Sequence, residues 1–222
     1  MITLNEQISL FKAIGNQLNK KIDCFVIGGS AMLFYELKQT TKDIDIVLTE
    51  DDDRKLLVRV LREMGFESRS ETIFKYIEIA KNKPILMERR DGRLDLFCNE
   101  IISTKLSPGI IDRVTQKHEF SNLVANIISP EDIILLKCAT ERAGDRADAA
   151  AIIKSREIDW DTVINESIWQ TTHGKRIFTI FLFDFMMELR EDYKVDIPLT
   201  AIKRVTKIYE EEMMKHIKKY NK

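Results

Sequence analysis

Two aspartates separated by a single residue, Asp43 and Asp45, are the side chains of this sequence best placed for chemistry. Ile44, Ile46 and Leu48 alternate with Asp43, Asp45 and Val47, which is the period-two pattern of a β-strand with one face toward a core. Because side chains alternate along a strand, both carboxylates point to the same side. Neighbouring carboxylates repel each other, and Mg²⁺ prefers a few carboxylates together with substrate phosphates. The pair therefore indicates either a metal site or two acids at an exposed strand end.

A third acid, Asp95, follows in a second apolar segment and has Leu94 and Leu96 as its neighbours. On a strand, this acid lies on the polar side while its neighbours are buried. It would complete a cluster of three carboxylates, which can hold divalent ions that bridge the attacking and leaving oxygens of an in-line displacement. A surface-facing residue of an ordinary strand is the alternative interpretation.

The turn Gly28-Gly29-Ser30 separates an apolar run at residues 24–27 from a short helical pattern. Glycines lack a Cβ, so the backbone amides of such a turn can approach an anion, and the start of a helix favours negative charge. The turn is therefore a candidate phosphate-binding element. An ordinary strand-to-helix connection with a serine cap has the same sequence pattern.

Together these residues resemble the nucleotidyltransferase signature of the DNA polymerase β-like superfamily. In that superfamily a Gly-Gly or Gly-Ser turn precedes an Asp-x-Asp pair flanked by apolar residues, and a third acid follows on a neighbouring strand. The chain has the same order in Phe25 to Ser30, in Lys42 to Val47 and in Leu94-Asp95-Leu96. The resemblance covers residues 22–98 and implies a minimal mixed sheet flanked by helices.

The resemblance also implies a role for each residue of the signature. It implies that Asp43 and Asp45 are catalytic acids that ligate a pair of Mg²⁺ ions, with Mn²⁺ as the alternative metal. It implies that Asp95 is the third catalytic acid and ligates the ion that activates the nucleophile. The glycine turn would bind the nucleotide, with Gly29 and Ser30 at the β and γ phosphates.

The implied reaction is transfer of a nucleoside monophosphate from an NTP, such as ATP, to a tRNA, a protein or a small molecule. An alternative of a different class is a non-catalytic module of the same fold that binds a nucleotide or a partner protein, such as a toxin–antitoxin component. The presence of all three acids favours the enzyme, because a module that only binds is free to lose one of them.

A second resemblance lies farther along the chain, at Lys137, Arg142 and the segment Gly144 to Asp148. It is similar to the Lys and Arg-Asp-x-x-Asp segment of nucleotidyltransferases related to abortive-infection and toxin–antitoxin systems, although Gly144 stands where an Arg usually precedes the first Asp. The resemblance implies a nucleotide-binding role, in which Lys137 and Arg142 supply positive charge to the triphosphate and Asp145 orients them or accepts a proton. Solvated ion pairs on helices are an equal alternative.

The elements expected to position these residues begin with a mixed region. Helical periodicity and apolar runs predict a first helix at 5–20, strands at 24–27 and 44–48, and helices at 30–37 and 50–64. The β-rich segments 72–79, 85–87 and 93–97 predict antiparallel additions to the same sheet. A short helix or loop is expected at 108–117 and a strand at 123–128.

Beyond this region the sequence is expected to be helical. Ser129 followed by Pro130 is typical of a helix start, and the later patterns predict helices at 130–142, 145–155, 160–171, 174–192 and 198–220. We therefore expect an α+β (mixed α/β) protein in which a small mixed β-sheet flanked by helices precedes a helical C-terminal region. The corresponding domains are a nucleotidyltransferase catalytic domain at 1–128 and a helical domain at 129–222.

Composition limits the environment and the partners. The formal net charge of −1 argues against broad electrostatic binding to nucleic acid, which usually requires a strongly basic domain. Three dispersed cysteines provide no disulfide framework, and no stretch approaches the length of an apolar membrane span. We expect a cytoplasmic protein that binds an NTP donor and an acceptor such as tRNA, makes no membrane contact, and pairs with a partner protein or a second copy of itself.

Overall fold

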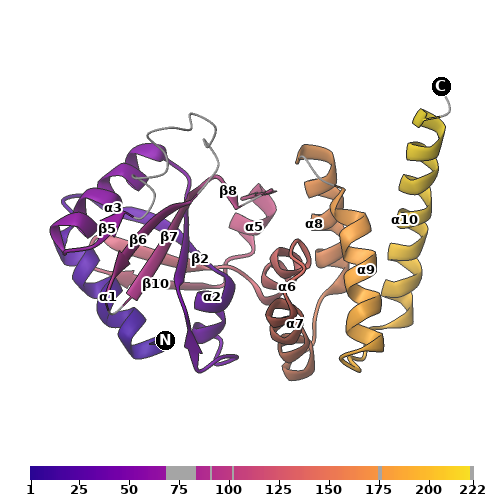
Figure 1. Ribbon diagram of the computed structural model, residues 1–222, viewed down its shortest axis with the longest axis horizontal. Coiled ribbons are helices and arrows are strands. Elements are labelled where there is room, and N and C mark those ends of the chain that lie inside the picture. The colour runs from indigo at the N-terminus through magenta and orange to yellow at the C-terminus, as the bar shows by residue number, and fades with distance from the viewer. Residues whose placement is uncertain (69–83, 91, 102, 175–176, 221–222) are drawn as a thin grey trace. The chain divides into compact units, whose positions relative to one another are not determined.

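The structure, a computed structural model, describes residues 1–68, 84–90, 92–101, 103–174 and 177–220, with residues 215–220 described by their backbone alone. The chain divides into two compact units, Met1–Ser129 and Pro130–Lys222 (Figure 1). The first unit combines a β-sheet with helices, and the described part of the second is helical. The expected fold class, a mixed sheet with helices followed by a helical region, is confirmed.

Short strands form the sheets of the first unit: β1 (Ile2–Thr3), β2 (Ile22–Ile27), β3 (Thr40–Thr41), β4 (Ile44–Leu48), β5 (Glu67–Ser68), β6 (Ile85–Arg89), β7 (Gly92–Cys98), β8 (Glu100–Ile101), β9 (Thr104–Lys105), β10 (Gln116–Phe120) and β11 (Leu123–Ile127). The main sheet has the strand order β10-β11-β2-β4-β7-β6-β5, while β8 pairs with β7 and β9. β4 is antiparallel to β2 and parallel to β7. β1 and β3 form a separate two-stranded sheet.

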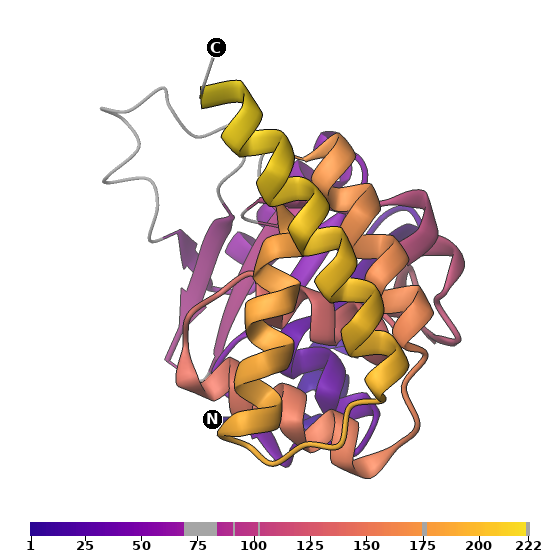
Figure 2. The ribbon, with the colours of Figure 1, turned by 90° about the vertical axis from the view of Figure 1, so that its right-hand side faces the viewer.

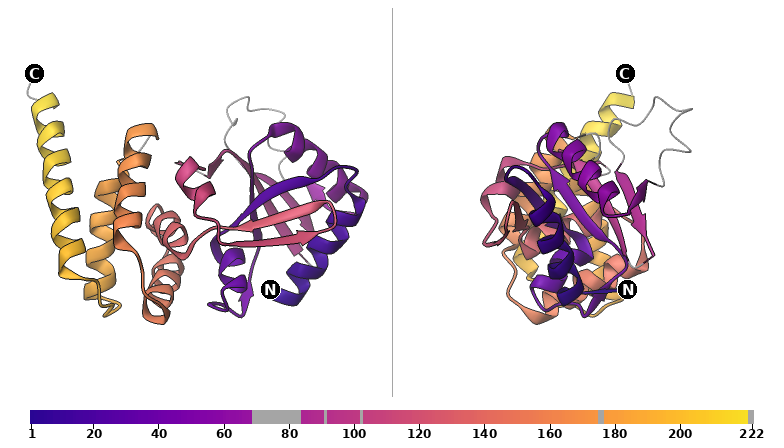
Figure 3. Two further views of the ribbon diagram at one scale, coloured as in Figure 1. Left: turned by 180° about the vertical axis from the view of Figure 1, so that it is seen from behind. Right: turned by 90° about the vertical axis from the view of Figure 1, so that its left-hand side faces the viewer.

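The helices of the first unit are α1 (Leu4–Gln17), α2 (Gly28–Phe34), α3 (Asp51–Glu63) and α5 (Pro108–Asp112). A capping box starts α1, because the Glu6 amide donates to Thr3 Oγ1 at 3.3 Å and the Thr3 amide donates to the Glu6 carboxylate at 2.8 Å. α1 and α3 lie side by side, with α1 against β10 and β11 and α3 against β4 and β7. Figure 3 shows these helices and the β10–β11 hairpin.

The core of the first unit explains why the strands hold their positions. Phe11 and Ile14 of α1 and Leu57 and Leu61 of α3 have no exposed surface. On β4, the alternating residues from Ile44 to Leu48 are likewise fully buried. Each such side chain contributes about 1.5–3 kcal/mol when it is fully buried. A shift of β4 by one residue would move its acids into this core, so burial fixes the register of the strand.

Three expectations about the first unit are corrected. β6 is antiparallel to β7, but β7 is parallel to β4, because β7 is the second strand of a hairpin and therefore runs back in the direction of β4. The short helix or loop expected at 108–117 is present as α5 followed by a loop, but β10 begins at Gln116, before the expected end of that range. The short helix expected at 30–37 begins at Gly28 and ends at Phe34. The strand expected at 72–79 lies outside the described residues.

The second unit contains α6 (Pro130–Cys138), α7 (Ala143–Ser155), α8 (Trp160–His173), α9 (Phe178–Glu191) and α10 (Leu199–Tyr220). α6 begins at Pro130 as expected, but it ends four residues before the expected residue 142. α9 lies beside both α8 and α10 (Figure 2). Phe178, Leu182 and Phe185 of α9 are buried in the unit's core. Among the described helices, none has the length and apolar character needed to cross a membrane.

Candidate active site

Three neighbouring strands bring the glycine turn and the expected acids together. Asp45 of β4 lies opposite Ile27 of β2 on one side and opposite Asp95 of β7 on the other. Neighbouring strands are about 4.8 Å apart, so the two aspartates are adjacent across the sheet. Gly28 follows Ile27 directly, which places the turn at the end of the same row. Asp43 precedes β4 by one residue, and its negative charge acts on Asp95.

The glycine turn fits closely against Asp45 and Thr41. Gly28 has a φ of +61°, in the left-handed region that favours glycine, and a Cβ there would lie 2.9 Å from Asp45 Oδ2. A Cβ at Gly29 would lie 2.8 Å from Thr41 Oγ1 and 3.7 Å from the Lys38 ammonium. Side chains at either position would therefore collide with the site. The backbone of the turn thus lies between an acid of the sheet and a half-buried lysine.

The third residue of the turn, Ser30, is fully buried. Its hydroxyl donates to Gln7 Oε1 at 2.9 Å, and Gln7 Nε2 donates back to the Ser30 carbonyl at 3.4 Å. Gln7 is also fully buried and shares the inward face of α1 with Phe11 and Ile14. This pair of hydrogen bonds fixes the turn to α1, so Ser30 can meet a phosphate only through its backbone unless the bonds rearrange.

Arg93 binds the Asp95 carboxylate through two hydrogen bonds from its guanidinium group, one to each oxygen. Its Nε donates to Asp95 Oδ1 at 2.7 Å and its Nη2 donates to Asp95 Oδ2 at 2.6 Å. The two residues are two positions apart on β7, so alternation places them on the same side of the sheet. The sequence contained this signal, because an arginine two residues before a strand acid must share its face. Sequence reasoning nevertheless missed Arg93.

Burial and neighbouring charges set the protonation of this pair. Burial raises the pKa of Asp95 above its usual value, and the charges of Asp43 and Glu88 add to the rise, while Arg93 opposes it. The hydrogen bond to Asp95 raises the pKa of the Arg93 guanidinium, and Asp43 and Asp45 contribute in the same direction. Arg93 therefore lies in the combined field of all three expected acids.

The residues present fit a divalent cation. Asp43 and Asp45 are half-buried, and Asp95 lies in register with Asp45, so the site offers hard carboxylate oxygens of the kind that Mg²⁺ and Mn²⁺ bind. Within the described residues, no three His, Cys, Asp or Glu side chains are already gathered as a metal-binding group. Both Asp95 oxygens point to Arg93 instead.

Within the second unit, the expected residues form a charged cluster. Lys137 is 5% exposed, and its ammonium donates to Asp145 Oδ1 at 2.9 Å and to Asp148 Oδ2 at 2.7 Å. Arg142 Nε donates to Asp145 Oδ2 at 2.9 Å, and the Thr140 hydroxyl also donates to that oxygen. Burial raises the pKa of Asp145, but the Thr140 hydrogen bond and the Lys137 charge outweigh burial and hold it below its usual value. The cluster links α6 to α7.

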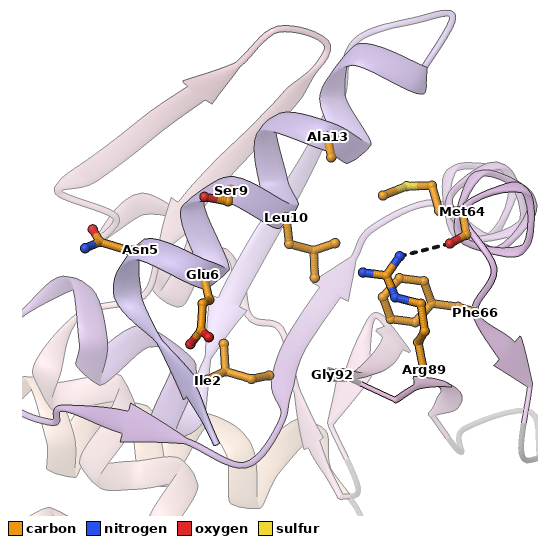
Figure 4. Close-up of a pocket in the computed structure, with 10 residues that line it drawn as sticks. All are labelled: Ile2, Asn5, Glu6, Ser9, Leu10, Ala13, Met64, Phe66, Arg89 and Gly92. Atoms are coloured by element: carbon orange, nitrogen blue, oxygen red, sulfur yellow. Dashed lines mark hydrogen bonds between the residues drawn. The ribbon is translucent and has the colours of Figure 1, made fainter.

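A cavity of about 450 Å³ lies elsewhere in the first unit (Figure 4). Its lining includes Arg89, which stacks over the Phe66 ring at 4.6 Å and donates to the Met64 carbonyl at 3.0 Å. Gly92 also lines the cavity and is an odd number of positions from Asp95 on the same strand. Alternation therefore places this cavity and the acids on opposite faces of the sheet.

Comparison with known proteins identifies the family of the chain. The chain matches the family described as "Nucleotidyltransferase of unknown function (DUF6036)" over residues 1–178. The protein is therefore a nucleotidyltransferase, and it belongs to that family. Among solved structures, it is similar to ANT(2″)-Ia in complex with adenylyl-2″-tobramycin, with 15% sequence identity, a TM-score of 0.49, and coverage of 75% of this chain and 97% of that chain. No curated protein matches the sequence.

The expected enzyme class is thereby confirmed, and transfer of a nucleoside monophosphate is the general reaction of the family. The structure brings together the turn, Asp43, Asp45 and Asp95 within one region of the sheet. It places Lys137, Arg142 and Asp145 in the helical cluster. The catalytic, metal-binding and nucleotide-binding roles of all these residues stay predictions, as does the division of roles between the two units.

Proposed function

We propose that this nucleotidyltransferase transfers a nucleoside monophosphate from an NTP to an acceptor oxygen, in a reaction that depends on Mg²⁺ held by Asp43, Asp45 and Asp95. The observation that supports the proposal is the row formed by the Gly28 turn, Asp45 and Asp95 across three neighbouring strands. A phosphate-binding turn next to an acid cluster is what phosphoryl transfer requires, because its catalysis consists mainly of positioning and charge stabilisation.

The chain's residues would divide the work as follows. Gly28, Gly29 and Ser30 would hold the triphosphate through their backbone, since glycines let a ligand approach closely and the Ser30 hydroxyl is bonded to Gln7. The Lys38 ammonium lies beside Gly29 and would offset phosphate charge. Sequence reasoning missed this lysine, because only the fold brings it to the turn.

The carboxylates would position the cations. When bound, Mg²⁺ would stabilise the negative charge that develops on the transferred phosphoryl group. The acceptor oxygen forms a bond to the α-phosphorus, the bond from that phosphorus to the bridging oxygen breaks, and pyrophosphate leaves together with the acceptor's proton. A tRNA, a protein and a small molecule are the acceptor classes to be compared, in the cytoplasmic setting expected from the sequence.

The test is an incubation of the protein with each of the four NTPs carrying an α-phosphate label, together with Mg²⁺, total cellular RNA and a cell extract. We expect one macromolecule or small molecule to become labelled and pyrophosphate to be released. Asp45→Asn is the matched control, because it preserves side-chain volume and removes the ligand charge. Equal labelling by the Asp45→Asn protein, or labelling that persists without a divalent cation, contradicts the proposal.

A further inference from the structure

Arg93 and Asp95 form an ion pair with two hydrogen bonds within the sheet's acid cluster. Both Asp95 oxygens accept a hydrogen bond from the same guanidinium, at 2.7 and 2.6 Å. The Asp95 side chain is 10% exposed and the Arg93 side chain is 34% exposed. Asp95 is thus enclosed, whereas Arg93 reaches it from a position open to solvent. A planar guanidinium that meets a carboxylate in this way combines charge with fixed geometry, and it is stronger than a single point contact.

This pairing has a cost for metal binding, because a carboxylate ligates a cation through the same oxygens. Both of these oxygens are engaged by Arg93. Consistent with this arrangement, the described acids are not gathered into a three-ligand group. A cation that uses Asp95 must either share these oxygens with the positively charged guanidinium or displace it. Because like charges repel, Arg93 and the cation oppose each other at this carboxylate.

The surroundings of Arg93 show where its charge acts. The acids Asp43 and Asp45 act on its guanidinium in addition to Asp95. In the absence of a divalent cation, these carboxylates repel one another, and one guanidinium among them reduces that repulsion. When cations neutralise the acids, the guanidinium loses this role but stays beside the same site. Its fork of donors then matches the oxygens of a phosphate as well as it matched those of Asp95.

We propose that Arg93 is the resident counter-ion of Asp95, that a divalent cation displaces it, and that the displaced guanidinium then binds the triphosphate of the substrate. The inference rests on the proposed function, since it requires a cation site at these acids. It makes Arg93 a substrate-binding residue whose availability depends on the metal. The nucleotide would then bind strongly only after the cation, because the guanidinium is otherwise engaged.

This role predicts effects of opposite sign on two ligands. Arg93→Met removes the competitor, so the dissociation constant for Mn²⁺ alone should fall roughly ten-fold or more, the order expected when one charge-assisted contact no longer opposes binding. The same variant lacks the phosphate-binding fork, so its affinity for inorganic tripolyphosphate in saturating Mn²⁺ should fall roughly ten-fold. A purely structural role would weaken the binding of both ligands.

Two further variants distinguish competition between Arg93 and Mn²⁺ for Asp95 from a general effect of the positive charge. Arg93→Lys keeps the positive charge but loses the fork, so competition predicts tighter Mn²⁺ binding in this variant too, whereas a general field effect predicts the wild-type value. Arg90→Met removes an exposed arginine three residues earlier in the chain, and it should leave both affinities unchanged. Circular dichroism spectra like that of the wild type would establish that each variant is folded.

The experiment is a titration with Mn²⁺ followed by electron paramagnetic resonance, and then a titration with tripolyphosphate followed by calorimetry. Tighter Mn²⁺ binding together with weaker tripolyphosphate binding in Arg93→Met supports the inference. Mn²⁺ binding equal to or weaker than that of the wild type overturns it, as does unchanged tripolyphosphate affinity. If neither the wild type nor Arg93→Met binds Mn²⁺, the proposed function itself is contradicted.

Discussion

Two clusters of charged side chains, one in each unit, use similar residues in opposite ways. In the helical unit, carboxylates and cations are matched: Lys137 binds Asp145 and Asp148, and Arg142 binds Asp145 again. In the sheet unit, Arg93 binds Asp95, and the charges of Asp43 and Asp45 also act on its guanidinium. The matched cluster centres on the buried Lys137 and joins two helices, whereas the acid-rich cluster lies beside a glycine turn. The difference teaches that the surroundings of a charged cluster, and not the presence of charge alone, indicate whether it serves stability or the binding of an external cation.

The largest expected effect on stability is that of replacing Lys137, the central residue of the matched cluster. Lys137→Ala leaves two carboxylates near the helix interface without their ammonium partner, so the free energy of unfolding should fall by about 3–5 kcal/mol. Urea unfolding followed by circular dichroism measures this change. Lys154→Ala is the control, because this exposed lysine donates one hydrogen bond to the Tyr193 carbonyl and should cost about 1 kcal/mol or less. Small and equal effects in both variants would show that the matched cluster does not stabilise the unit.

A substitution in the acid-rich cluster should have the opposite result, with little effect on stability and a large effect on nucleotidyl transfer. Asp43→Asn removes a carboxylate that is half-buried and has acids as neighbours, so it should change the free energy of unfolding by less than about 1 kcal/mol. Mg²⁺-dependent nucleotidyl transfer should fall by roughly a hundred-fold or more, because metal ligation stabilises transition-state charge by several kcal/mol. Stability and transfer rate are measured on the same preparation. Near-wild-type transfer by the folded variant would show that Asp43 is not part of the active site.

A smaller effect is expected at Lys38, which lies beside Gly29. Lys38→Met removes the ammonium and keeps most of the side-chain volume, so the KM for the NTP should rise roughly ten-fold, the order of one charge-assisted contact. Steady-state kinetics at saturating Mg²⁺ provide the measurement. Lys12→Met is the control, because Lys12 is an exposed residue of α1. A KM equal to that of the control would show that Lys38 does not interact with the phosphates of the NTP.

The smallest effect is expected at the exposed end of the matched cluster. Arg142 contacts Asp145, but its side chain is 76% exposed. An exposed ion pair is worth about 0–1 kcal/mol, so Arg142→Ala should lower the free energy of unfolding by no more than that. Chemical denaturation next to Lys137→Ala would give the contrast. If Arg142→Ala lowered the free energy of unfolding as much as Lys137→Ala, the exposed fraction of a side chain would not predict how strongly it stabilises Asp145.

The local pattern of the sequence predicted the acid strand and the glycine turn, because both depend on neighbouring residues. The alternation from Ile44 to Leu48 was sufficient to predict the strand that carries Asp45, and Asp43 lies one residue before that strand. Arg93 was also within reach of this reasoning, since its spacing from Asp95 is local. The parallel pairing of β4 with β7 was not, because the chain between them sets their relative direction.

Contacts between distant residues account for the rest. Gln7 holds Ser30 across 23 positions, and no periodicity in either segment indicates that pair. Lys137 reaches Asp148 across 11 positions and a bend between two helices, so its partners could not be read from helical spacing. The segment at β10 was missed because its alternating polar residues carry little apolar signal, and its pairing with β11 decides its conformation.

We propose that the acids of the sheet hold the cation through which this nucleotidyltransferase binds an NTP. Thermal unfolding with each NTP, with and without Mg²⁺, tests it directly in the wild type and in Asp45→Asn, and it needs no knowledge of the acceptor. Ligand at about 100 times its dissociation constant stabilises a folded protein by about 2.7 kcal/mol, which corresponds to a rise in Tm of roughly 5–10 °C at this chain length. We expect that rise for at least one NTP, only with Mg²⁺ and only in the wild type. An equal rise in Asp45→Asn, or a rise without any divalent cation, would contradict the claim.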